Sequence, residues 1–267
     1  MKGQPQLAAK PLRAGHSVWR NYWKYRYLTL LLIPVIAYFF IFKYMPIYGL
    51  SIAFKDFKIL QGINGSEWNG LVTFNKLFSK ANFWLVFRNT VVIGAYQFIF
   101  GFPAPIIFAL LLNEVRNARF KKAVQTISYL PHFVSWVVLA GLFTQFLSPS
   151  TGPINHLIVQ MGGTPIYFLA SKAWFRTILV VTNIWKSIGW GAIIYLAALS
   201  NVDPELYEAA EMDGAGRLCK ALHITLPSIM PIVTIMLIMQ SGKLLSDNFD
   251  QVFNLYNPAV YEVARCV

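Results

Sequence analysis

The sequence contains little charge, and that scarcity excludes the commonest class of protein. Of its 267 residues only 13% are charged and only 11 are acidic, whereas 56% are apolar. An ordinary soluble domain carries about 25% charged residues. The composition therefore excludes a soluble globular domain and predicts that long apolar runs lie in a lipid bilayer.

Groups that could perform catalysis or hold a cofactor are also scarce. The phosphate-binding pattern G-x-x-x-x-G-K-[ST] does not occur, since the single Gly-Lys pair, Gly242-Lys243, lacks both the upstream glycine and the following hydroxyl residue. The patterns H-E-x-x-H and G-x-S-x-G are absent, and the four histidines have no metal-ligand spacing. We therefore expect no catalytic residue, no metal site and no bound cofactor in this chain.

Only two cysteines are present, Cys219 and Cys266. The predicted spans place them on opposite sides of the membrane, so they can neither form a disulfide with each other nor share a metal ion. We expect two free thiols.

Five apolar runs approach or reach the length that crosses a bilayer core of about 30 Å. They predict an all-α, polytopic membrane helix bundle whose spans cover residues 28–43, 89–112, 124–147, 174–199 and 224–241. The first run lacks a small-residue cleavage site and is longer than the apolar region of a signal peptide, so we interpret it as a retained span.

The segments between and after the spans are richer in turn-forming residues. Residues 55–84 are predicted to form a polar loop, and residues 148–173 a second loop with one short interfacial helix at Ile154–Met161. The third span contains Pro131 in its interior. Residues 242–267 are polar enough that we expect them to leave the membrane.

The N-terminal tail, residues 1–27, combines cations with aromatic rings. Directly before a span, such a segment is expected at the lipid headgroups, where amphipathic rings and basic groups both prefer to lie. Nucleic-acid binding is the alternative for interleaved basic and aromatic residues, and the neighbouring span argues against it.

Basic residues are distributed unevenly over the segments between spans, and this predicts an orientation. The N-terminal tail, residues 113–123 and residues 203–227 together carry twelve Lys or Arg, whereas the opposite segments carry seven. Cytoplasmic segments carry the excess of basic residues. We therefore expect the N-terminus and residues 203–227 to be cytoplasmic.

Residues 203–227 hold five of the eleven acidic residues within eleven positions. Asp203 can cap a helix whose first position is Pro204, because proline lacks only an N–H that would be unpaired there. Gly214 can adopt the left-handed conformation that ends the helix. A second amphipathic piece follows from Arg217 to His223 and is predicted to turn at Ile224–Pro227 into the last apolar run.

Three short blocks of this segment match a known family. They are Glu208-Ala209-Ala210, then Asp213-Gly214-Ala215, then Ile224-Thr225-Leu226-Pro227. At this spacing they resemble the EAA loop of binding-protein-dependent ABC importer permeases, and we call residues 203–227 the coupling loop. Residues 42–46 and 52–57 are similar to the oligosaccharide and polysaccharide branch of these permeases, which is related to the maltose type.

The resemblance implies a function for the whole chain. A permease of this family carries a carbohydrate across the bacterial cytoplasmic membrane by alternating access. Its expected partners are a second homologous permease, two cytoplasmic ATPase subunits that bind ATP and Mg²⁺, an extracytoplasmic solute-binding protein, an oligosaccharide substrate and the lipid bilayer, without nucleic acid. The chain itself is then no enzyme.

The resemblance also assigns the residues that contact the ATPase. They are Glu208, Ala209, Ala210, Asp213, Gly214, Ala215, Ile224, Leu226 and Pro227. The alanines let the helix lie close to the ATPase, and Glu208 and Asp213 offer charge to its basic groups. Gly214 allows the turn, where we expect a side chain to strain the backbone and to clash.

Polar residues inside the spans are candidates for a sugar pathway, because they are costly in lipid and usually face the bundle interior. Asn183, Lys186 and Trp190 fall at helical spacing on one face of the fourth span. They can bind hydroxyl groups and stack on pyranose rings, or they can be interhelical contacts, and the sequence leaves both interpretations open. For Gln97 and Gln145 we favour the interhelical role.

Two expectations concern the limits of the chain and the rival functions. The family normally has six spans, so we expect a chain that is truncated after Tyr261–Ala264 and lacks the last one.

A secondary transporter or channel is the main alternative function, but apart from Lys186 no span has a central charge. A membrane enzyme requires convergent histidines or carboxylates, which the sequence does not place together.

Overall fold

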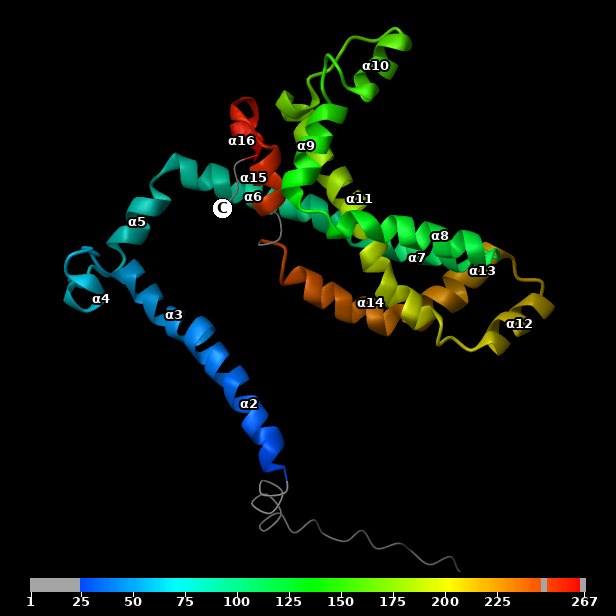
Figure 1. The fold of residues 1–267 in the computed structure, drawn as a ribbon, viewed down its shortest axis with the longest axis horizontal. Helices are drawn as coiled ribbons and strands as arrows, with labels where there is room; N and C mark the ends of the chain where they lie inside the picture. Colours follow the sequence, from blue (N-terminus) through cyan, green and yellow to red (C-terminus); the bar gives the residue numbers. More distant parts are fainter. Residues whose placement is uncertain (1–24, 246–248, 265–267) are drawn as a thin grey trace, which may run out of the picture. The chain divides into compact units, whose positions relative to one another are not determined.

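The computed structural model describes residues 25–245 and 249–264, and these form two units. The first unit extends to Lys80 and the second begins at Ala81. The described residues form helices and no strand beyond one isolated antiparallel bridge, Lys55 to Trp68. The prediction of an all-α membrane protein is therefore confirmed (Figure 1). The N-terminal tail up to residue 24 and Cys266 lie outside the described residues.

The first unit begins with one long apolar helix rather than the 16-residue span that was predicted. Its segments are α2 (Arg26–Phe39), η1 (Phe40–Tyr44), α3 (Met45–Gly49) and η2 (Leu50–Phe54), which together run for 29 residues. No side chain in α2 is buried by the described residues of the first unit. Such a helix, apolar on all sides, is typical of a segment that faces lipid.

Residues 55–84, predicted as a polar loop, contain short helices and a folded turn. Helix α4 covers Gly62–Gly65 and α5 covers Val72–Phe78. The rings of Phe54 and Trp68 stack with centroids 5.7 Å apart, next to a backbone hydrogen bond from Asn69 to Phe54 of 2.8 Å. The segment is thus an ordered loop in which Trp68 and Asn69 contact Phe54.

The second unit contains the remaining helices, and their bounds differ from the predicted spans mainly at the ends. They are α6 (Ala81–Gly101), α7 (Pro103–Asn113), α8 (Ala118–Tyr129), η3 (Leu130–Phe133), α9 (Trp136–Phe146), α10 (Pro153–Gln160), η4 (Phe168–Ala170), α11 (Lys172–Leu199), α12 (Pro204–Met212), α13 (Arg217–Lys220), η5 (Ala221–Thr225), α14 (Leu226–Ser241), α15 (Phe249–Leu255), η6 (Pro258–Val260) and α16 (Tyr261–Ala264). The short helix predicted in the loop before α11 is present as α10.

Helix α11 is the centre of this unit, since α6, α7, α8, α14, α15 and α16 all pack against it (Figure 1). Its side chains contribute to two apolar clusters. One cluster, which includes Phe175 and Leu179, joins α11 to α6, α9 and the C-terminal helices. The other, which includes Ala192 and Tyr195, joins it to α7 and α14. Residues 249–264 therefore pack onto the bundle.

The third predicted span is not straight. The segments Ala118–Phe133 and Trp136–Phe146 meet at an angle of 106°. Pro131 cannot donate a backbone hydrogen bond, and Ser135 caps the new helix by accepting a bond from Val138 N at 3.4 Å. By length and composition the described residues offer four membrane spans, or five if this bent pair is one span.

Two π-helical turns precede an X-Pro pair in the same way. The turn η1 is followed by Met45-Pro46, and η5 is followed by Leu226-Pro227. A proline ring crowds the carbonyl four residues before it and offers it no N–H, so a wider turn relieves the crowding. The predicted turn at Ile224–Pro227 is consequently wrong: the helix continues from Arg217 to Ser241 through η5.

Helices α8 and α11 approach each other at Gly189. A methyl group at Gly189 would meet the backbone carbonyl of Ser128 closer than real Cβ atoms ever lie. We expect Gly189→Ala to force the helices apart and to destabilise the protein by about 1–3 kcal/mol, the usual cost of overpacking. The midpoint of thermal aggregation of the purified protein measures this loss.

The matched control is Gly141→Ala in α9, where nothing lies within 4 Å of the added methyl group. Alanine favours a helix over glycine, so this variant should be at least as stable as the parent protein. Equal stability of the two variants would show that α8 and α11 do not pack as the structure has them.

Candidate functional site

The coupling loop begins with a capped helix. Asp203 has an extended backbone and its carboxylate accepts a hydrogen bond from Glu205 N at 3.0 Å. Pro204 occupies the first turn and Glu205 places a negative charge at the positive end of the helix dipole. The predicted start of α12 is confirmed.

The end of α12 is a Schellman motif, which requires a residue with a left-handed backbone. Gly214 has φ = +77°. The N–H of Ala215 donates to Ala210 O at 2.9 Å, and the N–H of Gly214 donates to Glu211 O at 3.0 Å. The predicted role of Gly214 is confirmed, but the predicted clash is wrong, since nothing in the described chain lies within 4 Å of an added Cβ.

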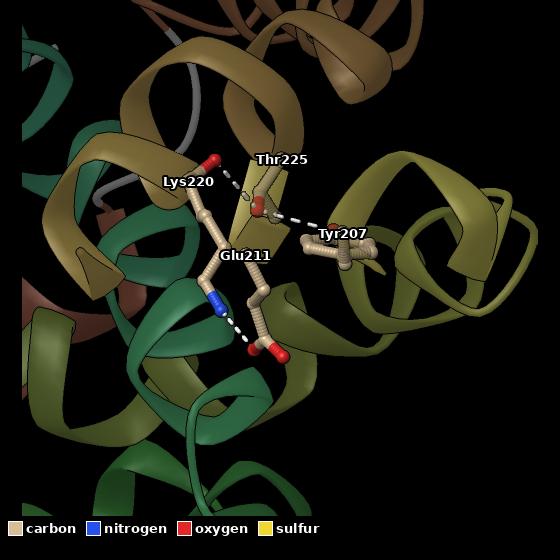
Figure 2. Close-up of polar contacts among 4 residues, drawn as sticks. All are labelled: Tyr207, Glu211, Lys220 and Thr225. Atoms are coloured by element: carbon tan, nitrogen blue, oxygen red, sulfur yellow. Dashed lines mark hydrogen bonds and ion pairs between the residues drawn. The ribbon is translucent and has the colours of Figure 1, made fainter. Parts of the chain in front are cut away.

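The inner face of α12 is tied to the helix that follows the turn, as Figure 2 shows. The hydroxyls of Tyr207 and Thr225 lie 3.1 Å apart, and Thr225, which is buried, also donates to Lys220 O at 3.2 Å. Lys220 forms an ion pair of 2.5 Å with Glu211, and the stem of the lysine is largely covered. These contacts fix α12 against the helix that continues into α14.

The same ion pair sets the charge state of Glu211. The hydrogen bond from Lys220 and its charge lower the pKa of the Glu211 carboxyl, with a smaller contribution from Arg116. A lowered pKa means that the contribution of the ion pair to stability is complete at neutral pH. It is lost only as the pH falls through the lowered value.

The outer face of α12 carries acidic and apolar side chains that nothing in the described chain covers. Glu208, Ala209 and Asp213 are exposed, and Met212 exposes 89% of its surface. Leu218, after the turn, exposes 74%. Exposed apolar groups among charges are typical of a surface that binds a partner protein.

The other residues that were assigned to ATPase contact lie differently. Ala210 and Ala215 are half-buried at the inner side of α12 and in the turn. Ile224 and Leu226 are half-buried in the continuous helix, and Pro227 is exposed on it. Of these five residues, only Pro227 is exposed to a partner in the described chain.

The three pathway candidates of α11 have different partners. Asn183 Nδ2 donates to Gln97 Oε1 at 3.1 Å. Lys186 Nζ donates to Val134 O at 2.5 Å and lies 4.9 Å from the ring centroid of Trp136, at the bend between α8 and α9.

Trp190 completes this set through a ring contact. Its indole stacks on His132 with centroids 4.6 Å apart and planes inclined by 3°. Each of the three candidate side chains therefore contacts another segment of the bundle. Asn183 and Trp190 also line a cleft, whereas Lys186 does not.

A buried amide network joins α6, α11 and α15. Gln251 donates to Leu179 O at 2.7 Å and to Thr182 Oγ1 at 2.8 Å, and its own oxygen accepts from Gln97 Nε2 at 2.9 Å. Gln97 in turn accepts from Asn183. The interhelical role favoured for Gln97 is thus present. Gln251 was missed, because its segment was predicted to leave the membrane.

Two clefts follow one face of α11. A cleft of about 390 Å³ lies between α7, α11 and α14, and its lining includes Asn183, Trp190 and Gln240. A second cleft of about 620 Å³ lies between α6 and α11, toward the end of α11 that is remote from α12, and its lining includes Lys172 and Arg176. Among the described residues no group of three or more His, Cys, Asp or Glu could hold a metal ion.

Comparison with known families identifies this arrangement. Residues 101–247 match the model of the binding-protein-dependent transport system inner membrane component. This chain belongs to that family. The match covers the whole coupling loop and the cleft lined by Asn183 and Trp190, but not Tyr96 and Phe100 in the wall of the second cleft.

Known relatives include sugar and polysaccharide permeases. The permease is 48% identical over 240 residues to the polygalacturonan/rhamnogalacturonan transport system permease protein YteP of Bacillus subtilis, covering 90% of this chain and 75% of that protein. It is 28% identical over 190 residues to the lactose transport system permease protein LacF of Rhizobium radiobacter, covering 70% of this chain and 63% of that protein.

Solved structures give the same fold. The permease matches a chain of a bacterial ABC transporter involved in the import of the acidic polysaccharide alginate, with a TM-score of 0.84, 41% identity and coverage of 93% of this chain and 83% of that one. A second structure, the alginate transporter in complex with an alginate pentasaccharide-bound periplasmic protein, matches with a TM-score of 0.85 and 40% identity over 93% and 83% of the two chains. The permease is therefore a multi-pass membrane component of a sugar or polysaccharide ABC importer.

Proposed function

We propose that this permease moves an acidic oligosaccharide across the bacterial cytoplasmic membrane by alternating access, driven by a separate ATPase that docks on the coupling loop. Its complex contains a second homologous permease, two cytoplasmic ATPase subunits that bind ATP and Mg²⁺, and an extracytoplasmic solute-binding protein. The acidic class is supported by two relatives, whose names specify polygalacturonan and the acidic polysaccharide alginate.

The geometry of α12 is the observation that carries this proposal. Its outer face presents Glu208, Met212 and Asp213 to a partner, while its inner face is fixed through Tyr207 to Thr225. A helix whose outer face is exposed and whose inner face is hydrogen-bonded to the next helix can transmit the displacement of a docked partner to that helix. Movement of a docked ATPase would therefore shift the helix that continues into α14, which packs against α11.

Such coupling requires the ATPase to bind the two alternating-access states of the permease with different affinities, because a partner with equal affinity for both does not shift the equilibrium between them. We assign this difference in affinity to α12 and its turn. We place this segment in the cytoplasm, together with the N-terminus. The excess of basic residues on that side supports the orientation.

The cleft between α7, α11 and α14 is the proposed sugar pathway. Asn183 and Trp190 line it together with Gln240. Because Asn183 gives its amide N–H to Gln97, its carbonyl oxygen is oriented by the buried network and can accept a sugar hydroxyl. Lys186 does not line this cleft, and we propose that it positions the bend at Val134 on which the pathway wall rests.

Met212 gives the most direct test of docking. We expect Met212→Glu to weaken co-purification of the ATPase about tenfold or more, since a charge would replace an apolar contact at the centre of the interface. The matched control is Met161→Glu, a methionine that is 88% exposed at the end of α10.

In the proposed orientation Met161 lies on the opposite side of the membrane, so this control should bind the ATPase like the parent permease. The measurement is the ratio of ATPase to permease after affinity purification from membranes. Binding that is unaffected by Met212→Glu would contradict docking on α12, and a permease that imports sugar without any ATPase would show a secondary transporter instead.

A further inference from the structure

We propose that Lys172 and Arg176 form a carboxylate-binding subsite, which holds uronate groups of the oligosaccharide at the entrance of the pathway. This inference rests on the proposed function and assigns the acidic part of the substrate to named side chains. The subsite lies in the cleft of about 620 Å³ between α6 and α11.

The helical register of α11 connects this cleft to the sugar pathway. Lys172, Arg176, Val180, Asn183 and Ser187 are spaced by four, four, three and four residues. Residues at this spacing share one face of a helix. The first three line the outer cleft, and the last two line the cleft assigned to the sugar. One continuous face thus leads from two cations to the pathway.

The hydrogen bonds of Arg176 within the described chain leave part of its guanidinium for a ligand. One terminal nitrogen donates to Asn89 Oδ1 at 3.0 Å, and Asn89 is itself buried and donates to Glu262 O at 2.9 Å. In the part of the chain that the structure describes, Arg176 Nε is buried without a hydrogen-bond partner. A buried donor left unpaired is costly, which shows that the chain does not satisfy this guanidinium. Arg176 also lines the cleft, where its guanidinium can bind a carboxylate.

Lys172 is held by a contact that a substrate can replace. Its Nζ forms an ion pair of 2.5 Å with Glu262, and the two side chains expose 52% and 69% of their surface. Exposed ion pairs of this kind contribute little to stability. The hydrogen bond from Lys172 and its charge lower the pKa of Glu262, so the carboxylate stays ionised at neutral pH. Glu262 therefore occupies the lysine until a uronate carboxylate displaces it.

The opposite wall of the cleft suits a sugar ring. Tyr96 and Phe100 of α6 line it, and they expose 43% and 55% of their surface. Aromatic surfaces with a few convergent polar groups are typical of sites for small ligands. Thr177 adds a hydroxyl to the lining. Two cations, one hydroxyl and two rings match a uronic acid, which carries a carboxylate and hydroxyls on a ring with apolar faces.

The test compares two probes in the complete importer, reconstituted in lipid with its partner subunits and binding protein. One probe is a tetrasaccharide of galacturonic acid, and the other is the same tetrasaccharide with its carboxyl groups reduced to alcohols. We expect the double variant Lys172→Gln/Arg176→Gln to lower the initial rate of ATP-dependent uptake of the acidic probe at least about tenfold more than that of the reduced probe. This factor corresponds to one lost hydrogen bond to a charged group.

Two further variants separate a ligand-binding role from a structural one. Lys76→Gln removes a positive charge from an exposed lysine of α5 and should leave the ratio of the two uptake rates unchanged. Glu262→Gln removes the competing carboxylate from Lys172, so it should raise the preference for the acidic probe.

The outcomes separate this inference from the proposed function. If the double variant lowers both uptake rates by the same factor, or keeps the preference, the subsite is overturned while the importer stands. The subsite is equally overturned if the parent importer takes up only the reduced probe, or if the variant instead changes the dependence of uptake on anionic phospholipid. Absence of ATP-dependent uptake of either probe by the parent complex would overturn the proposed function itself.

Discussion

Replacement of Gly214 by valine is expected to abolish ATP-driven import while the permease still inserts into the membrane. A residue other than glycine costs about 1–3 kcal/mol at a left-handed position, and a β-branched residue is especially unfavourable there. Gly214 has φ = +77° and its N–H closes the Schellman turn. The strained turn would rearrange and move α12 away from its contacts with Thr225 and Lys220. Every 1.4 kcal/mol corresponds to a factor of ten, so this strain alone lowers the population of the native turn by about 5- to 140-fold, and import is lost with it.

Gly216 provides the matched control, two residues further along the same turn. Its φ is −70° and nothing lies within 4 Å of an added Cβ. Gly216→Val should therefore retain most of the transport activity. The measurement is ATPase activity of the reconstituted complex, stimulated by the loaded binding protein, beside the amount of permease in the membrane. Equal stimulation of both variants would mean that the backbone of this turn does not transmit the coupling.

Gln251→Leu is expected to give the largest loss of stability, because the substitution breaks a buried network at three points. Gln251 is 2% exposed and its amide bonds to Leu179 O, Thr182 Oγ1 and Gln97. Each buried polar group left without a partner costs about 1–3 kcal/mol. Asn183 should also lose its orientation, because Gln97 would be free to turn away from it.

The control for this variant is Asn254→Leu on the same helix, which removes an amide that, among the described residues, donates to Asp250 O one turn earlier. The midpoint of thermal aggregation in detergent should fall by several degrees for Gln251→Leu and remain near the parent value for Asn254→Leu. Similar midpoints for both variants would show that α15 is not held in the bundle by its buried amide.

Local signals made the coupling loop predictable from the sequence. Asp203, Pro204 and Gly214 act through hydrogen bonds to residues at most four positions away, or through their own backbone preferences, so their effects do not depend on the rest of the fold. The absence of a clash at Gly214 could not be deduced, because it depends on the space around the turn. For the same reason the inner and outer faces of α12 became distinguishable only in the structure.

The shape of the spans was harder to predict. Pro131 signals a break, but the 106° bend depends on the packing of α8 against α11 and of α9 against α15. A proline close to an apolar run can end a helix or widen one turn of it, and hydropathy does not separate the two. At Pro227 the wider turn η5 keeps the helix continuous, so the predicted turn was wrong.

The segment after Gly242 shows what composition leaves open in a membrane bundle. Its polar composition predicted that it leaves the membrane but did not predict its partners: Gln251 is buried against α11 and Asn257 donates to Leu169 O at 3.0 Å. Val252 and Leu255 add to an apolar cluster on the same helix. Amide side chains that find buried partners look the same in a sequence as amides that face water. Only the partners, which lie more than sixty residues away in the chain, distinguish them.

The most direct test of the account is ATP hydrolysis by the reconstituted complex of this permease, its homologous partner and the ATPase, with and without the loaded binding protein. The account predicts hydrolysis that rises with the loaded binding protein, is accompanied by uptake of the acidic oligosaccharide, and is lost in Gly214→Val. Uptake that proceeds without ATP, or stimulation that survives Gly214→Val, would contradict coupling through the loop after α11.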